Sequence, residues 1–224
     1  MQLIWLGQGG ILLKSKGMNI MIDPYFSDSV GKKDPAKHRR IPVSAQYADI
    51  KPDVLIFTHN HLDHYDPETV EPILKKHSSI TVLCPASVWS SVRQNGGDHN
   101  YVIFDRHTQW TENHVRFTAI KAAHSDEFAI GVLIEAEGKT VYVTGDTLYS
   151  KEIFKDLPDE IDVVFLPING VGNNMNHYDA AGFIAESKAK LAVPIHVGMF
   201  DTLSGEMLQV DNKVVLNTYE TLEV

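Results

Sequence analysis

The fold is decided by the stretch Val54-Leu55-Ile56-Phe57-Thr58-His59-Asn60-His61-Leu62-Asp63-His64. Its first four residues are apolar and have the length of a buried strand. A polar cluster follows at once, with three histidines and an aspartate between positions 59 and 64. This pattern predicts a strand whose carboxyl end carries the cluster in a loop, which is where open α/β sheets bind their ligands.

The side chains of this cluster are of the types that bind zinc, manganese and iron. Because four of them so close in sequence cannot all reach one ion, the spacing predicts two neighbouring metal positions. We expect His59 and His61 to face one ion, and Asp63 and His64 to face another about 3.5 to 4 Å away, the usual separation in two-metal hydrolases. The alternative is a polar turn with incidental histidines. A chance run of this kind is rare in a chain with eleven histidines among 224 residues.

Three later residues of metal-binding type also follow apolar segments that we expect to be strands. His124 comes after residues 115–121, Asp146 after 140–144, and His196 after 191–195. Taken singly, a histidine after a strand is more often a packed or exposed residue than a ligand. Together with the first cluster, the recurrence predicts that four strand ends converge on one rim.

The segment Thr58 to His64 resembles the signature of the metallo-β-lactamase superfamily. Ala123-His124-Ser125, Thr144-Gly145-Asp146-Thr147 and Pro194-Ile195-His196 resemble its later motifs. The resemblance implies a four-layer αββα sandwich, in which two mixed sheets pack face to face with helices outside. It also implies that Asp146 bridges two metals, one held by His59, His61 and His124 and the other by Asp63, His64 and His196.

Asp23, at the end of an expected strand over residues 19–22, resembles the first motif of the superfamily. There the resemblance implies an aspartate behind the metals that hydrogen-bonds a ligand histidine or the backbone. The alternative is that Asp23-Pro24 simply opens a turn.

Length and composition restrict the class of protein. A chain of 224 residues with 43% hydrophobic content suits one buried core, so we expect a single domain over residues 1–224. The net charge of −9 disfavours a nucleic-acid partner. The single cysteine, Cys84, excludes an internal disulfide, and neither a secretion signal nor an apolar run of ~18 residues is visible. We therefore expect a cytoplasmic protein without a membrane span, and a homo-oligomer stays open.

Elsewhere the sequence predicts alternating strands and helices in each half of the chain. Residues 25–50 read as a long polar connection without obvious structure. Further strands are expected at 3–6, 11–14, 79–84, 101–104, 130–135 and 161–166, and helices at 66–76, 86–93 and 179–189.

A finer resemblance connects the chain to the L-ascorbate-6-phosphate lactonase (UlaG-like) branch. It rests on Pro167-Ile168-Asn169-Gly170, on residues 172–176 and on Val197-Gly198-Met199-Phe200. The resemblance implies a small anionic substrate and tilts the metal toward manganese, with zinc and iron still open. The expected substrate-binding residues are basic or carry amides, although a solvated surface or a plain turn is the alternative for each: Lys37, Arg39, Arg40, Asn174 and Asn176.

These observations predict a metal-dependent hydrolase in which two divalent cations activate water to open a lactone or cleave an ester. Asp63 is the expected catalytic residue, because it could orient the nucleophile and later protonate the leaving alkoxide. A phosphodiesterase or nuclease of the same superfamily is an alternative. Two further alternatives require features that the sequence does not show. A di-iron oxidoreductase is expected to carry glutamate at position 61, where this chain has His61. A non-catalytic metal-binding module is expected to lack one of the metal ligands, and all seven are present.

Overall fold

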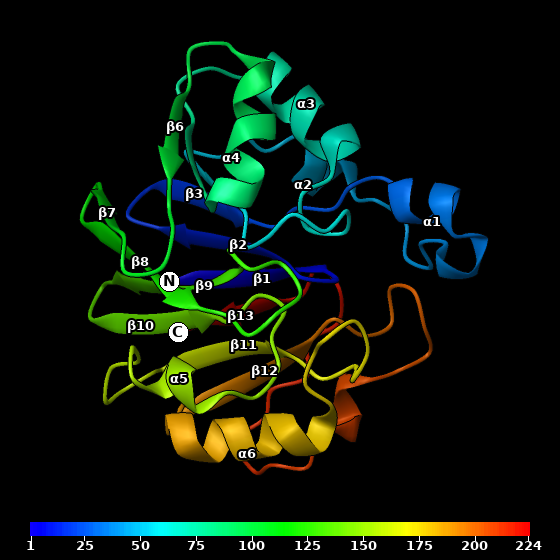
Figure 1. The fold of residues 1–224 in the computed structure, drawn as a ribbon, viewed down its shortest axis with the longest axis vertical. Helices are drawn as coiled ribbons and strands as arrows, with labels where there is room; N and C mark the ends of the chain where they lie inside the picture. The colour runs from blue at the N-terminus through cyan, green and yellow to red at the C-terminus, as the bar shows by residue number, and fades with distance from the viewer.

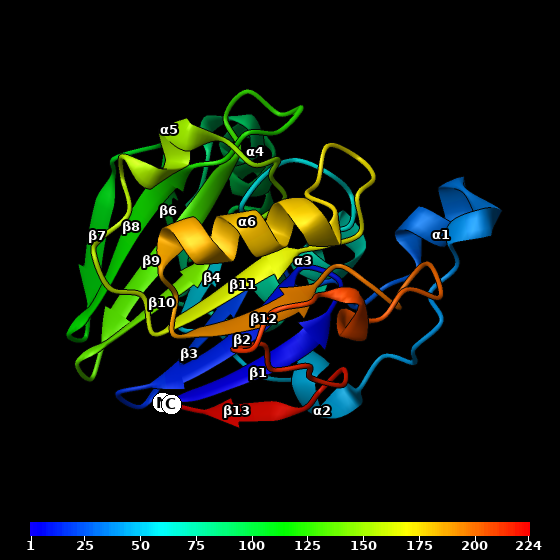
Figure 2. The ribbon, with the colours of Figure 1, turned by 90° about the horizontal axis from the view of Figure 1, so that it is seen from below.

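Two mixed β-sheets pack face to face, and helices cover their outer faces (Figures 1 and 2). The structure is a computed structural model that describes residues 1–224. The four layers of helix, sheet, sheet and helix confirm the predicted αββα class. None of the helices combines the length and the apolar character that a membrane span requires.

The first sheet has the order β13-β1-β2-β3-β4-β5-β6. Strands β1 to β3 form an antiparallel meander, and β3 to β6 run parallel. Its strands are β1 (Gln2–Gly7), β2 (Gly10–Ser15), β3 (Met18–Ile22), β4 (Val54–Ile56), β5 (Thr81–Cys84), β6 (Asn100–Ile103) and β13 (Thr221–Glu223).

The second sheet has the order β12-β11-β10-β9-β8-β7. Strands β7 to β10 are antiparallel, whereas β10, β11 and β12 are parallel. Its strands are β7 (Gln109–Glu112), β8 (Val115–Lys121), β9 (Ile130–Ala136), β10 (Lys139–Val143), β11 (Val163–Pro167) and β12 (Leu191–Ile195).

Helices α3 (Pro67–Lys76) and α4 (Ala86–Val92) cover the first sheet, and α5 (Lys151–Phe154) and α6 (His177–Ser187) cover the second (Figure 1). Strands β1 to β5 of the first sheet are buried on both faces, whereas the edge strands β6 and β13 are partly exposed. Leu3 and Trp5 belong to a core cluster of 41 residues that extends into the second sheet, whereas Ile4 and Leu6 pack with α3 and α4. This division follows from the two-residue period of a strand.

The segment 25–50 contains more structure than its sequence suggested. It forms α1 (Ser29–Lys33), a 3₁₀ turn at Pro35–Lys37 and α2 (Ala45–Ala48). Each is too short to show a clear helical period. Helix α1 projects from the body on the side where β11 and β12 end (Figure 2).

Four other elements depart from the prediction. Helix α6 begins at His177, two residues early, because the Asn176 side chain accepts hydrogen bonds from the backbone N–H groups of Tyr178 and Asp179. The strands β7 and β13 and the short helix α5 were not predicted. Strand β7 alternates exposed and half-buried residues at a sheet edge, so its apolar signal is weak.

Strand direction places the predicted site. Because β8 and β10 are both antiparallel to β9, β8 runs the same way as β10, β11 and β12. In the first sheet β1, β3 and β4 share one direction by the same reasoning. The residues that follow these seven strands gather along one edge of the sandwich, on the side of α1 (Figure 1).

Candidate metal centre

The structure brings all seven predicted metal ligands together at this edge. Two groups of three residues have ligand atoms within 4.8 Å of one another. The first group is His59, His61 and His124, and the second is Asp63, His64 and His196. Each group combines residues after β4 with residues from the second sheet, so the two sheets must pack together before either group is complete.

Asp146 lies against two histidines of the second group. Its Oδ1 is 3.3 Å from His64 Nε2, and its Oδ2 is 3.1 Å from His196 Nε2. The Asp146 charge also acts on the pKa values of His59 and His124 in the other group. Asp146 therefore acts electrostatically on both groups, and its role as a bridge between two ions stays a prediction.

The histidines of the first group each have one ring nitrogen tied to an oxygen. His59 Nδ1 lies 3.0 Å from the Thr58 hydroxyl, and His61 Nε2 lies 3.2 Å from the Ser125 hydroxyl. His124 Nδ1 lies 3.2 Å from the carbonyl oxygen of Asn173. Donation of N–H to these oxygens leaves the other nitrogen of each ring with a free lone pair.

The free nitrogens of this group converge. His124 Nε2 is 3.1 Å from His61 Nδ1, and His59 Nε2 is buried without any hydrogen-bond partner. A buried polar atom without a partner is costly unless a ligand satisfies it. The donor set therefore fits a divalent cation on three imidazole nitrogens.

In the second group His64 is fixed by Asp23, as the resemblance implied. His64 Nδ1 lies 2.7 Å from Asp23 Oδ2, which leaves Nε2 facing Asp146 and His196. Asp23 also accepts hydrogen bonds from the backbone N–H and the hydroxyl of Thr58. Asp23, His59 and His64 also have potential ligand atoms close together. Both Asp23 oxygens already accept hydrogen bonds from Thr58 and His64, so Asp23 orients these residues and does not face the metal positions.

His196 is held by two amide side chains. Its Nδ1 lies 2.9 Å from the Asn169 amide, whose Oδ1 is buried without a partner. Because rotation exchanges the two ends of an amide, Asn169 can accept from Nδ1–H with that oxygen and leave Nε2 free. Gln8 Nε2 donates to Asp63 Oδ2 at 2.8 Å and also lies 3.0 Å from His196 Nε2.

The two groups differ in electrostatics. Burial lowers the pKa of His59 and His124, so these rings are neutral and ready to bind metal. Burial opposes the charged form of His196 as well, but the carboxylates of Asp146 and Asp63 outweigh it and raise the His196 pKa to about 9. Asp146 is buried too, yet His196 and His64 hold its pKa well below its usual range.

Several residues at this edge adopt strained backbone conformations. The φ angles of Gln8, Asp23 and His196 are 49°, 44° and 63°, in the left-handed region that residues other than glycine rarely occupy. Each such residue costs about 1 to 3 kcal/mol and persists only where the surrounding structure enforces it. All three contact a metal-binding side chain or are one.

A cavity of about 520 Å³ opens onto the centre. The metal side of the wall contains Gln8, His61, Asp63, Asp146, Asn169, Asn174 and His196. The outer part contains Val30 and Lys37 from the α1 region, Val171 and Gly172 after β11, and Phe200 and Asp201 after β12.

The predicted substrate-binding residues are placed unequally. Lys37 and Asn174 line the cavity, and Asn174 Nδ2 donates to Asp146 Oδ2 at 2.9 Å. Arg39 instead donates to the carbonyl oxygens of Tyr25 and Ile41, which ties two loops together.

Arg40 and Asn176 also differ from the expectation that they bind substrate. The Arg40 side chain is exposed, and only its backbone N–H makes a contact, with the carbonyl oxygen of Met199. The Asn176 amide is occupied in capping α6. Neither side chain lines the cavity.

Sequence reasoning missed four residues that hold the ligands in place. Three of them contact residues far apart in the chain, such as Gln8 with Asp63 and Ser125 with His61, whereas Thr58 contacts its neighbour His59. Their only sequence signal was position, since each lies directly beside an expected strand end or a motif residue. The four are Gln8, Thr58, Ser125 and Asn169.

Comparison with known proteins agrees with this geometry. The profile of the beta-lactamase superfamily domain matches residues 18–197. A UPF0173 metal-dependent hydrolase of Geobacillus thermodenitrificans is 31% identical over 227 residues, covering 93% of this chain and 91% of the relative.

Solved structures share the fold at low identity. A metallo hydrolase from the archaeon Ignicoccus hospitalis superposes with a TM-score of 0.77 at 19% identity, covering 99% of this chain and 97% of that one. A diiron β-hydroxylase from Streptomyces venezuelae gives a TM-score of 0.77 at 16% identity, covering all of this chain and 54% of that one. Because this fold hosts different reactions, the structural likeness shows the fold alone.

The sequence matches, in contrast, extend over nearly the whole chain and include every predicted ligand position from His59 to His196. The chain therefore belongs to the UPF0173 family of metal-dependent hydrolases, within the metallo-β-lactamase superfamily.

Proposed function

We propose that this protein is a binuclear hydrolase that opens a lactone or cleaves an ester of a small anionic metabolite. One observation carries the proposal: the two groups of candidate metal-binding atoms lie side by side, with Asp146 against the second group, next to a cavity that Asp146 and Lys37 both line. Imidazole and carboxylate donors without a thiolate suit zinc, manganese or ferrous iron, and the resemblance to the lactonase branch favours manganese.

When bound, two divalent cations would lower the pKa of water and polarise the carbonyl oxygen of the substrate. The chain's own residues supply the positioning. Asp23, Thr58, Ser125, Asn169 and the carbonyl of Asn173 fix the histidine rings, as described above, so that few side chains need to reorganise during the reaction.

Asp63 is the best placed catalytic carboxylate. Its Oδ2 accepts the hydrogen bond from Gln8 and lies 3.3 Å from His196 Nε2. Burial opposes ionisation of Asp63, but the charges of His64 and His196 outweigh it and lower its pKa, so the group is a carboxylate at neutral pH. We propose that it accepts the proton of the attacking water and returns it to the leaving alkoxide.

The cavity and the charge favour a small molecule. A volume of about 520 Å³ lies within the range of about 300 to 1,000 Å³ that holds small ligands. A nuclease would need a basic surface around the site, whereas this chain has a net charge of −9. His61 occupies the position at which we expected glutamate in a di-iron oxidoreductase.

The test is metal analysis of the purified protein, followed by turnover of a panel of lactones, phosphodiesters and thioesters. We expect two equivalents of metal and hydrolysis of lactones or esters that Asp63→Ala abolishes. Asp53→Ala is the matched control, because Asp53 accepts a backbone hydrogen bond from Asn19 far from the metals. Turnover of phosphodiesters alone would replace the proposal with the phosphodiesterase alternative, and metal binding without any turnover would leave a binding module.

A further inference from the structure

The outer wall of the cavity is built from apolar side chains and one cation, and this combination restricts the substrate further. Val30, Val171 and Phe200 come from α1, the loop after β11 and the loop after β12. Three separate elements thus place apolar side chains around one opening. Beyond them the wall carries only Gly172, Lys37 and Asp201.

The apolar side chains remain partly exposed although the chain buries a large core elsewhere. Val171 is 64% exposed, and it stands between Gly170 and Gly172, which both have positive φ angles. Contact between an apolar side chain and water is unfavourable, and a bound apolar group removes this cost by covering the side chain. The exposure of Val171 at the mouth of a cavity therefore favours a ligand with a carbon body.

The wall is also held in place before any ligand binds. The buried Tyr25 ring packs edge-on against Phe200, with centroids 5.7 Å apart. Its hydroxyl accepts a hydrogen bond from the backbone N–H of Val30 at 3.1 Å. One buried tyrosine thus supports two of the three apolar residues, and a fixed wall loses little entropy on binding.

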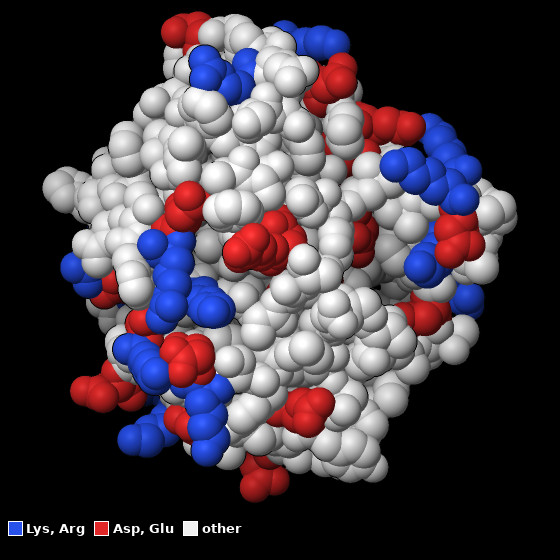
Figure 3. Space-filling model, viewed as in Figure 1, with Lys and Arg blue, Asp and Glu red and all other residues white.

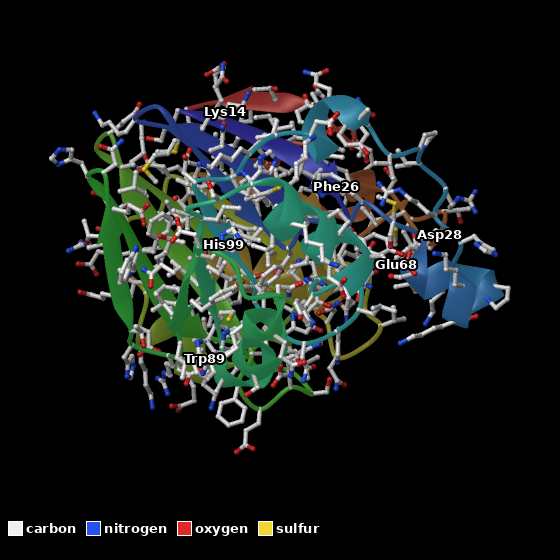
Figure 4. The ribbon with its side chains drawn as sticks, turned by 90° about the horizontal axis from the view of Figure 1, so that it is seen from above. Lys14, Phe26, Asp28, Glu68, Trp89 and His99 are labelled. Atoms are coloured by element: carbon white, nitrogen blue, oxygen red, sulfur yellow. The ribbon has the colours of Figure 1, made fainter.

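Lys37 lies on a projecting segment, residues 28–39, that we call the α1 arm. Asp28 lies at the base of the arm (Figure 4). It closes this base, because one carboxylate oxygen accepts from the Arg39 backbone N–H and the other pairs with His38. A further ion pair joins Lys32 to Glu68 at the start of α3. These contacts fix the arm beside the cavity.

Lys and Arg side chains gather on the side of the molecule where α1 projects (Figure 3). Among the cations of the arm, Lys37 alone lines the cavity. Its ammonium group has one protein partner, Asp34, at 3.5 Å, and both side chains are about half exposed. Such a pair contributes little and yields readily to a ligand. Asp201 is the opposing charge, but its Oδ1 already accepts from the backbone N–H groups of Gly198 and Leu203.

We infer that the substrate is an amphiphilic anion, with an apolar carbon body between the group cleaved at the metals and an anionic group that pairs with Lys37. This inference rests on the proposed function and names the substrate class of the same site. The apolar body lies against Val30, Val171 and Phe200. Compact, fully hydroxylated metabolites fit this wall less well, because their hydroxyl groups would lose water without gaining partners.

Carboxylates that imitate hydrolysis products provide a binding test that does not need turnover. Butyrate, succinate, octanoate and suberate vary chain length and terminal charge independently, and each offers a carboxylate to the metals. With manganese-loaded protein in a calorimeter, we expect suberate to bind at least about tenfold more tightly than succinate and about fivefold more tightly than octanoate. Equal affinities for all four acids would overturn the inference.

Charge variants test whether the substrate group next to Lys37 is anionic or cationic. Lys37→Met should remove the advantage of suberate over octanoate, about fivefold, and leave octanoate unaffected. Asp201→Asn keeps a side-chain oxygen for its two backbone hydrogen bonds and removes the repulsion, so it should strengthen suberate binding. Lys33→Met, an exposed cation of the arm outside the cavity, is the control. Stronger suberate binding in Lys37→Met together with weaker binding in Asp201→Asn would indicate a cationic substrate and overturn the inference.

A polar substitution tests the apolar body. Val171→Asn should reduce the preference for octanoate over butyrate severalfold, whereas Val43→Asn, at another exposed valine, should not.

The failure of this inference can be distinguished from the failure of the proposed function. If lactones or esters are cleaved but the acids show no ranking, only the inference falls; if nothing in the hydrolysis panel is cleaved, both fall.

Discussion

Asp23 Oδ2 lies 2.7 Å from His64 Nδ1, while its Oδ1 accepts a hydrogen bond of 2.8 Å from the backbone N–H of Thr58. A single buried carboxylate thus fixes both a ligand ring and the start of the loop that carries the first histidines. Its position at the end of β3, parallel and adjacent to β4, makes this double contact a direct result of the sheet topology.

Replacement of Asp23 should weaken metal binding without removing a ligand. We expect Asp23→Ala to lower metal affinity about 10- to 100-fold, because His64 loses the acceptor that selects its tautomer. Competition with a chelator measures the change, and Asp53→Ala is the control for loss of a carboxylate that accepts a backbone hydrogen bond. Unchanged affinity in Asp23→Ala would show that the His64 ring needs no such support.

Ser125→Ala should affect one metal position more than the other. The Ser125 hydroxyl lies against His61 Nε2, so its loss allows the proton to move to Nδ1, the nitrogen that faces His124. We expect about tenfold weaker binding of one equivalent in a two-step titration. The second equivalent, and both equivalents in the exposed-site control Ser91→Ala, should be unchanged. Equal weakening of both equivalents would contradict the assignment of Ser125 to His61.

Metal binding should release protons at neutral pH. Burial disfavours the charged form of His196, but Asp146 and Asp63 outweigh it and raise the His196 pKa to about 9. A histidine must lose its proton before it binds a metal. The affinity for metal should therefore rise about tenfold for each unit by which the pH increases toward that pKa, and level off above it. Calorimetry in buffers of different ionisation enthalpy counts the protons. Affinity that does not change between about pH 6 and 8 would refute the prediction.

Asp156 should contribute to stability only above acidic pH. Burial opposes its ionisation, but the hydrogen bonds of Arg106 and His107 outweigh it and lower its pKa from 3.8. The Asp156 pKa is thus lower in the folded protein than in the unfolded chain, where it is 3.8. The ionised carboxylate therefore stabilises the fold above pH 3.8, and this stabilisation is lost as the pH falls through the pKa of the folded protein.

Asp156→Asn should therefore cost about 1 kcal/mol at pH 7 and progressively less in acid. Urea unfolding of the metal-free protein across this pH range measures the difference. Asp159→Asn, at an exposed neighbour without an ion pair, is the control. A cost that stays constant as the pH falls would mean that Asp156 acts through packing and not through its charge.

The fold and the metal-binding positions were predictable from sequence because their signals are local. An apolar run followed by His59-Asn60-His61-Leu62-Asp63-His64 indicates both a strand and its functional end. The same pairing of strand and polar residue recurs before His124, Asp146 and His196. Strand direction then brings these ends together, and the structure adds the distances and hydrogen bonds between their side chains.

Apart from Thr58, the neighbour of His59, the residues that fix the ligands were not predictable, because their partners are distant in sequence. Gln8 and Asp63 are 55 positions apart, and Ser125 and His61 are 64 apart. Asn176 illustrates the opposite problem. An asparagine in a loop suits both a substrate and a helix cap, and only Asp179, three residues later, indicated the cap that the structure shows.

The metal centre also joins the two halves of the chain. Four of its side chains precede residue 65 and belong to the first sheet, and three follow residue 123 and belong to the second. Ions bound there would hold the two sheets together. If the chain were produced as two fragments divided between β6 and β7, neither fragment would hold a complete ligand set, and added metal would promote their reassembly.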